Sequence, residues 1–109
     1  MSGDALSRAL RNVVRNAVEA ESSTLNIDVS STEQEIAIRV TDNGPGMTAE
    51  QVGRVFEPFF TTKAKGTGLG LAISRQELED AGGRLSCTSE PGQGTTFTLH
   101  LPTQRPANA

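Results

Sequence analysis

Two kinds of alternation between apolar and polar residues divide this chain into helices and strands. From residue 4 to about residue 20, apolar residues recur every three to four positions, which predicts an amphipathic helix. Residues 24–30 and 35–42 alternate residue by residue instead, which predicts two half-buried strands joined as a hairpin. The same alternation in residues 84–90 and 95–102 predicts a second hairpin.

Two further helices are expected between the hairpins. Thr48 is a plausible N-cap for a short helix, and a longer helix should run from about Leu71 to Ala81, where two glycines end it. Residues 60–70 show no periodicity and are expected to form a mobile loop. The resulting order, helix–strand–strand–helix–helix–strand–strand, predicts an α+β domain, a two-layer α/β sandwich in which helices cover one face of the sheet.

Length, charge and composition narrow the classes of function. The 109 residues suit one domain, expected to span residues 1–102 with a polar tail over 103–109. The 10 basic and 13 acidic residues give a net charge of −3, which argues against a nucleic-acid-binding face. The single cysteine, Cys87, excludes an internal disulfide, and no apolar run is long enough to span a membrane. The single histidine, His100, excludes a metal site built from several histidines, and its strand setting predicts a structural role.

The turn DNGPGM, residues 42–47, begins with a carboxylate that turn chemistry alone does not require. Asp42 stands at a strand end, where it can accept a hydrogen bond from an exocyclic amine such as that of adenine. Gly44 and Gly46 allow the backbone to approach a flat ring or a phosphate without a Cβ clash. From these residues alone, a simple turn and a ligand site are equally good interpretations.

Two asparagines, Asn12 and Asn16, lie one turn apart in the first predicted helix. Asparagine is a poor helix former, because its amide competes for backbone hydrogen bonds. Asn16 falls at the boundary of the apolar stripe, where an amide oxygen could ligate Mg²⁺, a hard cation that prefers oxygen. Taken alone, the pair is more simply explained as two solvated polar residues.

The segment KAKGTGLGL, residues 63–71, leads directly into a predicted helix. A helix N-terminus presents free N–H groups and the positive end of its dipole, which favours an anion. Lys63 and Lys65 add positive charge just before the glycines. A phosphate site is therefore favoured over a flexible connector. The segment PGQGTTF, residues 91–97, is by itself most simply a glycine hairpin.

The order and spacing of these segments together resemble the catalytic ATP-binding domain of a two-component sensor histidine kinase, which has the Bergerat fold. LRNVVRNAVEA resembles the N box, DNGPGM the G1 box, FEPFFTTK the F box, GTGLGLAI the G2 box and GQGTTF the G3 box. The short loop FTTKAKGTGLGL most resembles the nitrogen-regulator type. The resemblance implies a mixed, mostly antiparallel sheet with about three helices on one face, and an upstream first strand that this chain lacks.

The resemblance also implies roles for individual residues. Asp42 would bond the adenine amino group, with Thr95 helping through water, and Gly44 and Gly46 would let the chain pass close to the base. Asn16 would ligate Mg²⁺, and Asn12 would face the phosphates. The lid hinge and helix start that cradle the phosphates would comprise Lys63, Lys65, Gly66, Thr67, Gly68, Leu69, Gly70 and Leu71. The residues Phe56, Phe59 and Phe60 would pack the lid against the body or a partner helix, with plain core packing an equal alternative.

The function implied is binding of Mg²⁺-ATP and transfer of its γ-phosphoryl group to a histidine. The acceptor would lie on dimerisation and phosphoacceptor helices absent from this chain, so no catalytic residue is expected here. Related hydrolases carry a glutamate where this chain has Asn12, which implies slow hydrolysis at best. A response regulator would act downstream. The domain itself would be cytoplasmic, with no nucleic-acid partner and no direct membrane contact. Glu77 departs from the family, whose members usually carry an apolar residue there.

Two other classes stay open. An anti-sigma-type serine kinase, or a nucleotide-dependent protein-binding switch, could use the same fold, although FEPFFTTK argues against it. A scaffold with a dead site is the third possibility. The chain itself is expected to be an excised domain or a truncated product.

Overall fold

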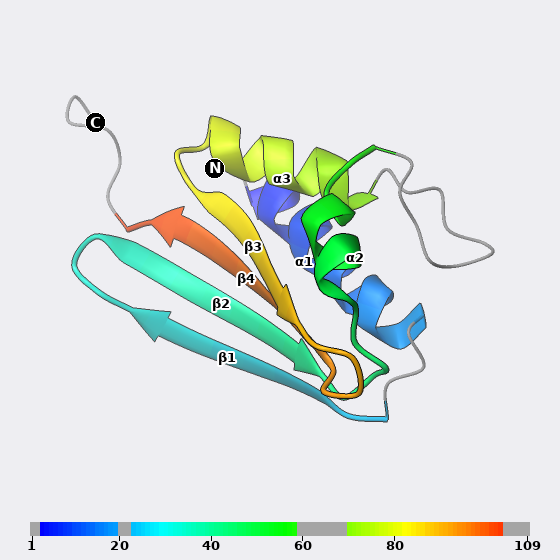
Figure 1. The fold of residues 1–109 in the computed structure, drawn as a ribbon. Helices are drawn as coiled ribbons and strands as arrows, with labels where there is room; N and C mark the ends of the chain where they lie inside the picture. The colour runs from blue at the N-terminus through cyan, green and yellow to red at the C-terminus, as the bar shows by residue number, and fades with distance from the viewer. Residues whose placement is uncertain (1–2, 20–22, 59–69, 104–109) are drawn as a thin grey trace.

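The chain folds into one sheet with its helices on one side (Figure 1). The computed structural model describes residues 3–19, 23–58 and 70–103. The elements in chain order are α1 (Gly3–Glu19), β1 (Leu25–Ser31), β2 (Glu35–Asp42), α2 (Ala49–Arg54), α3 (Gly70–Asp80), β3 (Arg84–Ser89) and β4 (Thr95–Pro102). The predicted order of elements is confirmed. None of the helices within the described ranges is long and apolar enough to cross a membrane.

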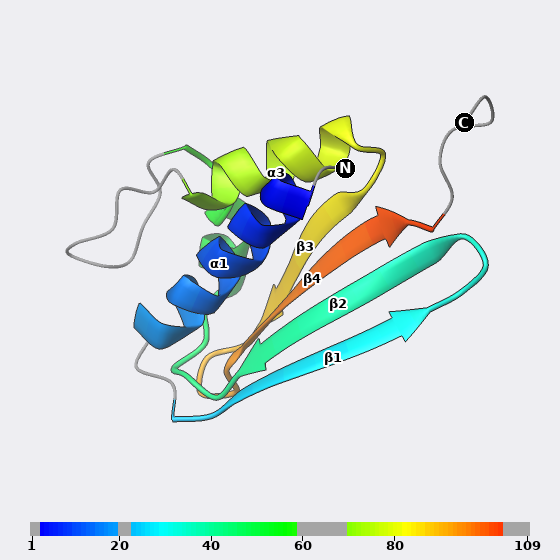
Figure 2. The same cartoon turned by 180° about the vertical axis from the view of Figure 1, so that it is seen from behind.

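The sheet joins the two predicted hairpins side by side. Its strand order is β1-β2-β4-β3, and each of these pairings is antiparallel. In this register Val40 of β2 lies between Ile27 of β1 and Phe97 of β4. The helices stand on one face of the sheet in both views (Figure 2), so the predicted α+β, two-layer arrangement is confirmed.

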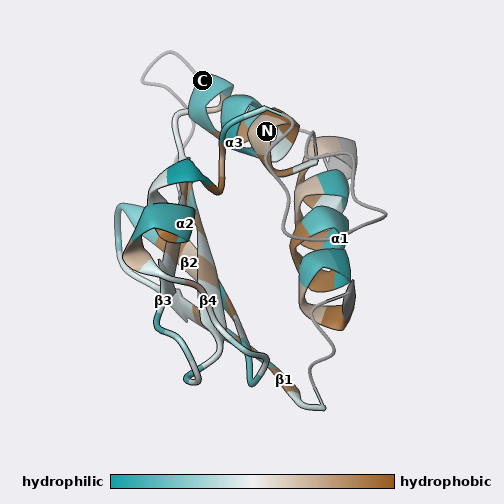
Figure 3. Ribbon diagram, turned by 45° about the vertical axis from the view of Figure 1, so that its right-hand side comes forward, coloured by the Kyte–Doolittle hydropathy of each residue, from teal (hydrophilic) through white to brown (hydrophobic). Residues whose placement is uncertain are grey.

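The core lies between the two layers. Val13 of α1 and Leu78 of α3 are fully buried against Val40, Phe97 and Leu99 of the sheet. Figure 3 shows hydrophobic and hydrophilic residues alternating along α1, as an amphipathic helix requires. Each large apolar side chain that is buried in this way contributes about 1.5–3 kcal/mol of transfer free energy.

The ends of the shorter helices follow their local sequence. Thr48 Oγ1 accepts from the Gln51 amide at 3.2 Å, and Gln51 Oε1 accepts from the Thr48 amide at 2.9 Å. This reciprocal capping box starts α2 where the sequence predicts it. At the end of α3, Gly82 takes a φ of +86° and the Gly83 amide donates to the Leu78 carbonyl at 2.8 Å. Such a left-handed cap stops a helix.

The alternation of β1 predicts a half-buried strand, and this prediction is wrong. Every residue of β1 is exposed. Ile27 and Val29 pair with Val40 and Ile38, so their side chains lie on the helix-facing side of the sheet. The helices nevertheless stand over the other strands, and β1 is the outermost one (Figures 1 and 2). Ile27 and Val29 therefore remain 56% and 62% exposed. The pattern predicted the strand and its apolar face correctly, but not whether a helix covers it.

An ion pair joins the two long helices. Arg8 of α1 donates hydrogen bonds from Nε and Nη2 to the two carboxylate oxygens of Glu77 in α3. An acidic residue at position 77 therefore makes a polar contact between α1 and α3 instead of an apolar one. Because the Arg8 side chain is 53% exposed, the pair contributes at most about 1 kcal/mol.

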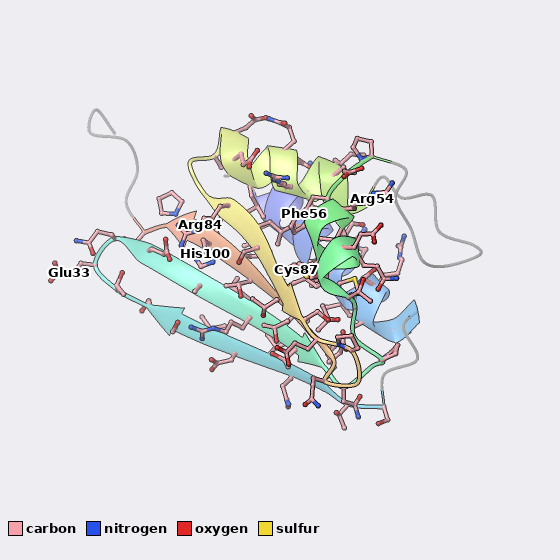
Figure 4. The ribbon with its side chains drawn as sticks, in the orientation of Figure 1. Glu33, Arg54, Phe56, Arg84, Cys87 and His100 are labelled. Carbon is pink, nitrogen blue, oxygen red and sulfur yellow. The ribbon has the colours of Figure 1, made fainter. Side chains whose placement is uncertain are left out.

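His100 has the structural role that the sequence predicts. Its Nδ1 donates to Glu35 Oε1 at 2.8 Å, and its Nε2 lies 3.4 Å from Ser86 Oγ. Arg84 adds an ion pair to the other oxygen of Glu35 at 3.3 Å. Figure 4 shows Arg84 and His100 side by side on β3 and β4, and Glu33 at the tip of the β1–β2 hairpin. This cluster links β2, β4 and β3 near one end of the sheet.

This cluster predicts a loss of stability in acid. The hydrogen bond from His100 lowers the pKa of Glu35 below its ordinary value of 4.5; burial opposes this shift, and the charge of Arg84 adds to it by a smaller amount. A carboxyl whose pKa is lower in the folded state stabilises the fold above its unfolded pKa, and this contribution is lost as pH falls through the folded value. Glu35→Gln should therefore lower the melting temperature at neutral pH, and the difference from the unmodified domain should shrink below pH 4.5.

Glu33→Gln is the matched control, because it removes the same charge from the adjacent turn. Its carboxylate makes no ion pair with any part of the chain that the structure describes. Differential scanning calorimetry from neutral to acidic pH makes the comparison. A constant difference between Glu35→Gln and the unmodified domain at every pH would contradict the prediction.

Candidate functional site

Two glycine-rich turns, one after β2 and one between β3 and β4, pack backbone to backbone. A Cβ at Gly46, whose φ is +73°, would overlap the carbonyl oxygen of Glu90. A Cβ at Gly94, with a φ of +80°, would overlap the carbonyl oxygen of Asp42. Both glycines are therefore required by contact within the protein, whatever else approaches them. The close approach predicted at Gly46 thus has a cause that needs no ligand.

Asp42 lies where these two turns meet. It is only 6% exposed, and its Oδ1 accepts from the Gly44 amide at 2.8 Å and from the Thr95 amide at 3.2 Å. Its second oxygen, Oδ2, receives no hydrogen bond from the described residues. A buried carboxylate oxygen without a donor is costly. Asp42 therefore has one oxygen held by two backbone amides and one oxygen that no donor among the described residues occupies.

Thr95 and Ser89 extend this site across the sheet. Ser89, the last residue of β3, pairs with Thr95, the first residue of β4, and their hydroxyl oxygens are 2.9 Å apart. The Ser89 oxygen also accepts from the Met47 amide at 2.8 Å, which ties the β2 turn to the β3–β4 hairpin. Sequence reasoning identified Thr95 and missed Ser89. Hairpin alternation could have found it, because it places Ser89 on the same face as Leu85 and Cys87.

Asn12 connects α1 to the start of α3. Its Nδ2 donates to the Gly70 carbonyl at 3.2 Å and to the buried Ser74 hydroxyl at 2.8 Å. A carbonyl only accepts, so the amide nitrogen must face Gly70 and Oδ1 is left for another donor or a cation. α3 begins at Gly70, and a Cβ there would lie 3.3 Å from Asn12 Oδ1. Asn12 thus fixes the helix that follows the predicted lid.

Asn16 is half-buried, one turn further along α1, as its boundary position predicts. Leu71 is also half-buried and packs against the core. The remaining predicted lid residues lie outside the described residues, as do two of the predicted phenylalanines; they are Lys63, Lys65, Gly66, Thr67, Gly68, Leu69, Phe59 and Phe60.

Phe56 packs into the core, which was one of its two predicted roles. Its ring meets that of Phe97 edge to face, with centroids 6.1 Å apart, and the Arg75 guanidinium lies 5.4 Å from its centroid. Met47 packs against the same core. Neither side chain therefore needs a ligand to explain its position.

Cys87 lies on β3 beside α2 (Figure 4) and packs against the core. Burial, and secondarily the negative charge of Asp42, raises the pKa of its thiol from 9.0 to about 12. Both causes disfavour the thiolate. This thiol is therefore a packing group next to the site.

Comparison with known proteins places this geometry in a family. A family model described as "Histidine kinase-, DNA gyrase B-, and HSP90-like ATPase" matches residues 1–105. The chain belongs to this ATPase family. The fold agrees, because the mycobacterial sensor histidine kinase MprB superposes with a TM-score of 0.84 at 31% identity, over 97% of this chain and 74% of that one.

Two similar full-length proteins are kinases. The ATPase domain is 42% identical over 101 residues to the sensor histidine kinase ZraS of Escherichia coli K12, and 35% identical over 105 residues to sporulation kinase E of Bacillus subtilis. These matches cover 91% and 94% of this chain, but only 22% and 14% of those proteins. The chain is therefore an ATP-binding domain of the kind found in sensor histidine kinases, and it spans about a fifth of ZraS.

The ATPase domain should keep Cys87 unreactive while it is folded. A pKa of about 12 in place of 9.0 leaves about a thousandfold less thiolate at pH 8, so alkylation by iodoacetamide should be slower than in the urea-unfolded chain by about that factor. Asp42→Asn removes the secondary cause and should speed alkylation of the folded domain several-fold. Asp28→Asn, an exposed substitution on β1, is the control. Equal rates in the folded and unfolded chains would contradict this prediction.

Proposed function

We propose that this domain binds Mg²⁺-ATP and delivers the γ-phosphoryl group to a histidine on separate dimerisation and phosphoacceptor helices, as part of a sensor histidine kinase. The observation that carries the proposal is the Asp42 carboxylate. One of its oxygens is held by two backbone amides, and the other accepts no hydrogen bond from the described residues. An amino group on a purine has the donor that such an oxygen lacks.

The amide side chains of α1 suit the other end of the nucleotide. Neutral amide oxygens are acceptable ligands for Mg²⁺. We assign the metal to Asn16, and Asn12 Oδ1, which accepts no hydrogen bond from the described residues, would face the phosphates or the water bound to the ion. Asn12 keeps this orientation because its Nδ2 donates hydrogen bonds to the Gly70 carbonyl and the Ser74 hydroxyl. When bound, the ion would neutralise charge on the triphosphate.

Asn12 also disfavours hydrolysis of ATP. An amide at position 12 cannot take a proton from an attacking water, as a carboxylate could. Transfer to an imidazole needs no such base: the γ-phosphorus bonds to the imidazole nitrogen, its bond to the β,γ-bridging oxygen breaks, ADP leaves and the imidazole loses a proton. Positioning and charge neutralisation supply most of the rate acceleration in such reactions.

The acceptor histidine belongs to another domain. His100 is the one histidine in the chain, and its two ring nitrogens contact Glu35 and Ser86. Its side chain is only 15% exposed. The low share of each relative that this chain covers also supports a larger parent kinase. As part of this proposal, a response regulator acts downstream and the site of action is the cytoplasm.

Isothermal titration with a non-hydrolysable ATP analogue tests the binding site. Asp42→Ala should weaken binding about tenfold or more, because it removes a hydrogen bond to a charged group. Asp42→Asn is the sharper variant, since it keeps an oxygen for the Gly44 and Thr95 amides but turns an NH₂ group toward the base. Asn16→Ala should abolish the difference between binding with Mg²⁺ and with EDTA. Asp28→Asn removes an exposed charge and should leave binding unchanged. Unimpaired binding by both Asp42 variants would refute the proposal.

The chemistry is tested by adding the phosphoacceptor helices of a related sensor kinase and radiolabelled ATP. Label that is lost in acid but stable in base would show phosphorylation of histidine, as expected. Acid-stable label on a serine would instead identify a serine kinase of the same fold. Nucleotide binding without transfer to any acceptor would favour a protein-binding switch, and the absence of any thermal shift with Mg²⁺-ATP would indicate a scaffold.

A further inference from the structure

Ser89 makes three hydrogen-bond contacts through one hydroxyl group. Its oxygen lies 2.8 Å from the Met47 amide nitrogen, 2.8 Å from the Gly94 carbonyl oxygen and 2.9 Å from Thr95 Oγ1. These three neighbours belong to the two turns that pack against each other and to the first residue of β4. Ser89 lies outside the five motif segments of the sequence.

The direction of each bond follows from counting protons. The Met47 amide can only donate to Ser89, and the Gly94 carbonyl can only accept from it. The single Ser89 proton therefore goes to Gly94, whose buried carbonyl would otherwise lose this donor. The remaining contact must then be donated by the Thr95 hydroxyl. With one bond donated and two accepted, the Ser89 oxygen is fully satisfied.

This arrangement determines what Thr95 can offer a ligand. Its hydroxyl proton is donated to Ser89 Oγ, so Thr95 Oγ1 can only accept a hydrogen bond from a ligand. Its backbone amide donates to Asp42 Oδ1, which places the residue directly beside the carboxylate. Asp42 Oδ2, which receives no hydrogen bond from the described residues, is also an acceptor. The Asp42 and Thr95 side chains therefore both present acceptors in this buried corner.

We propose that Ser89 is a positioning residue that makes the site select 6-aminopurines over 6-oxopurines. The proposal rests on nucleotide binding at Asp42, as argued above. Adenine carries a donor at C6, which suits the acceptors, directly or through a water molecule. Hypoxanthine and guanine carry an oxygen there, which would face oxygen lone pairs. Without Ser89, the Thr95 proton is free to rotate toward the base and donate to that oxygen.

Comparison of ATP with inosine triphosphate tests this assignment, because the two ligands share the same ribose and triphosphate and differ at the C6 edge of the base. Titration with each should show that Ser89→Ala lowers the ratio of ATP to inosine triphosphate affinity about tenfold, the size of one buried hydrogen bond. Ser89→Thr keeps the hydroxyl and should restore the ratio. Ser86→Ala lies on the same strand but on the opposite face, next to His100, and should leave the ratio unchanged.

A purely structural role for Ser89 would weaken both ligands in parallel and keep the ratio constant, which would overturn the proposal. Should Ser89→Ala not fold, Thr95→Val provides the second test, because removing the acceptor hydroxyl must also lower the ratio. Failure of the unmodified domain to bind either nucleotide would instead refute the proposed function.

Discussion

The bond from the Thr95 amide to Asp42 Oδ1 is the constraint on which the rest of the site depends. It joins the end of β2 to the start of β4 across 53 residues of sequence, and the Gly44 amide shares the same oxygen. Hydrogen bonds to a charged group are stronger than those between neutral groups, at about 1.5–3 kcal/mol each. Because both donors are backbone amides, their positions depend on the turns themselves. The carboxylate is therefore held by parts of the chain that cannot rotate away from it.

The close packing of the glycine turns supports this constraint. Gly46 against Glu90 and Gly94 against Asp42 leave no room for a side chain, so the two turns have few ways to move relative to each other. The Gly92 amide adds a bond of 2.7 Å to the Pro45 carbonyl. Rigid placement of a few polar groups is what selective recognition requires. At the other end of the site, Asn12 ties α1 to the first turn of α3, so both ends are attached to packed elements.

Much of this could be predicted from sequence because the signals are local. Alternation predicted the strands, Thr48 as an N-cap predicted the start of α2, and Asp42 and Thr95 were candidate site residues from the motifs. Contacts between distant segments leave no such local signal. The Arg8–Glu77 pair spans 69 residues and the Met47–Ser89 bond spans 42, so neither could be inferred from a pattern. The prediction that β1 is half-buried was wrong for the same reason, because alternation indicates which face of a strand is apolar but not whether another element covers that face.

β1 has a consequence for the handling of this domain. Within the described residues it is the edge of the sheet, and its exposed Ile27 and Val29 lie beside a row of backbone groups that no neighbouring strand pairs. Such an edge is a template for the addition of another strand. At high concentration the isolated domain should therefore tend to self-associate along β1, and any segment that pairs there would raise its solubility as well as its stability.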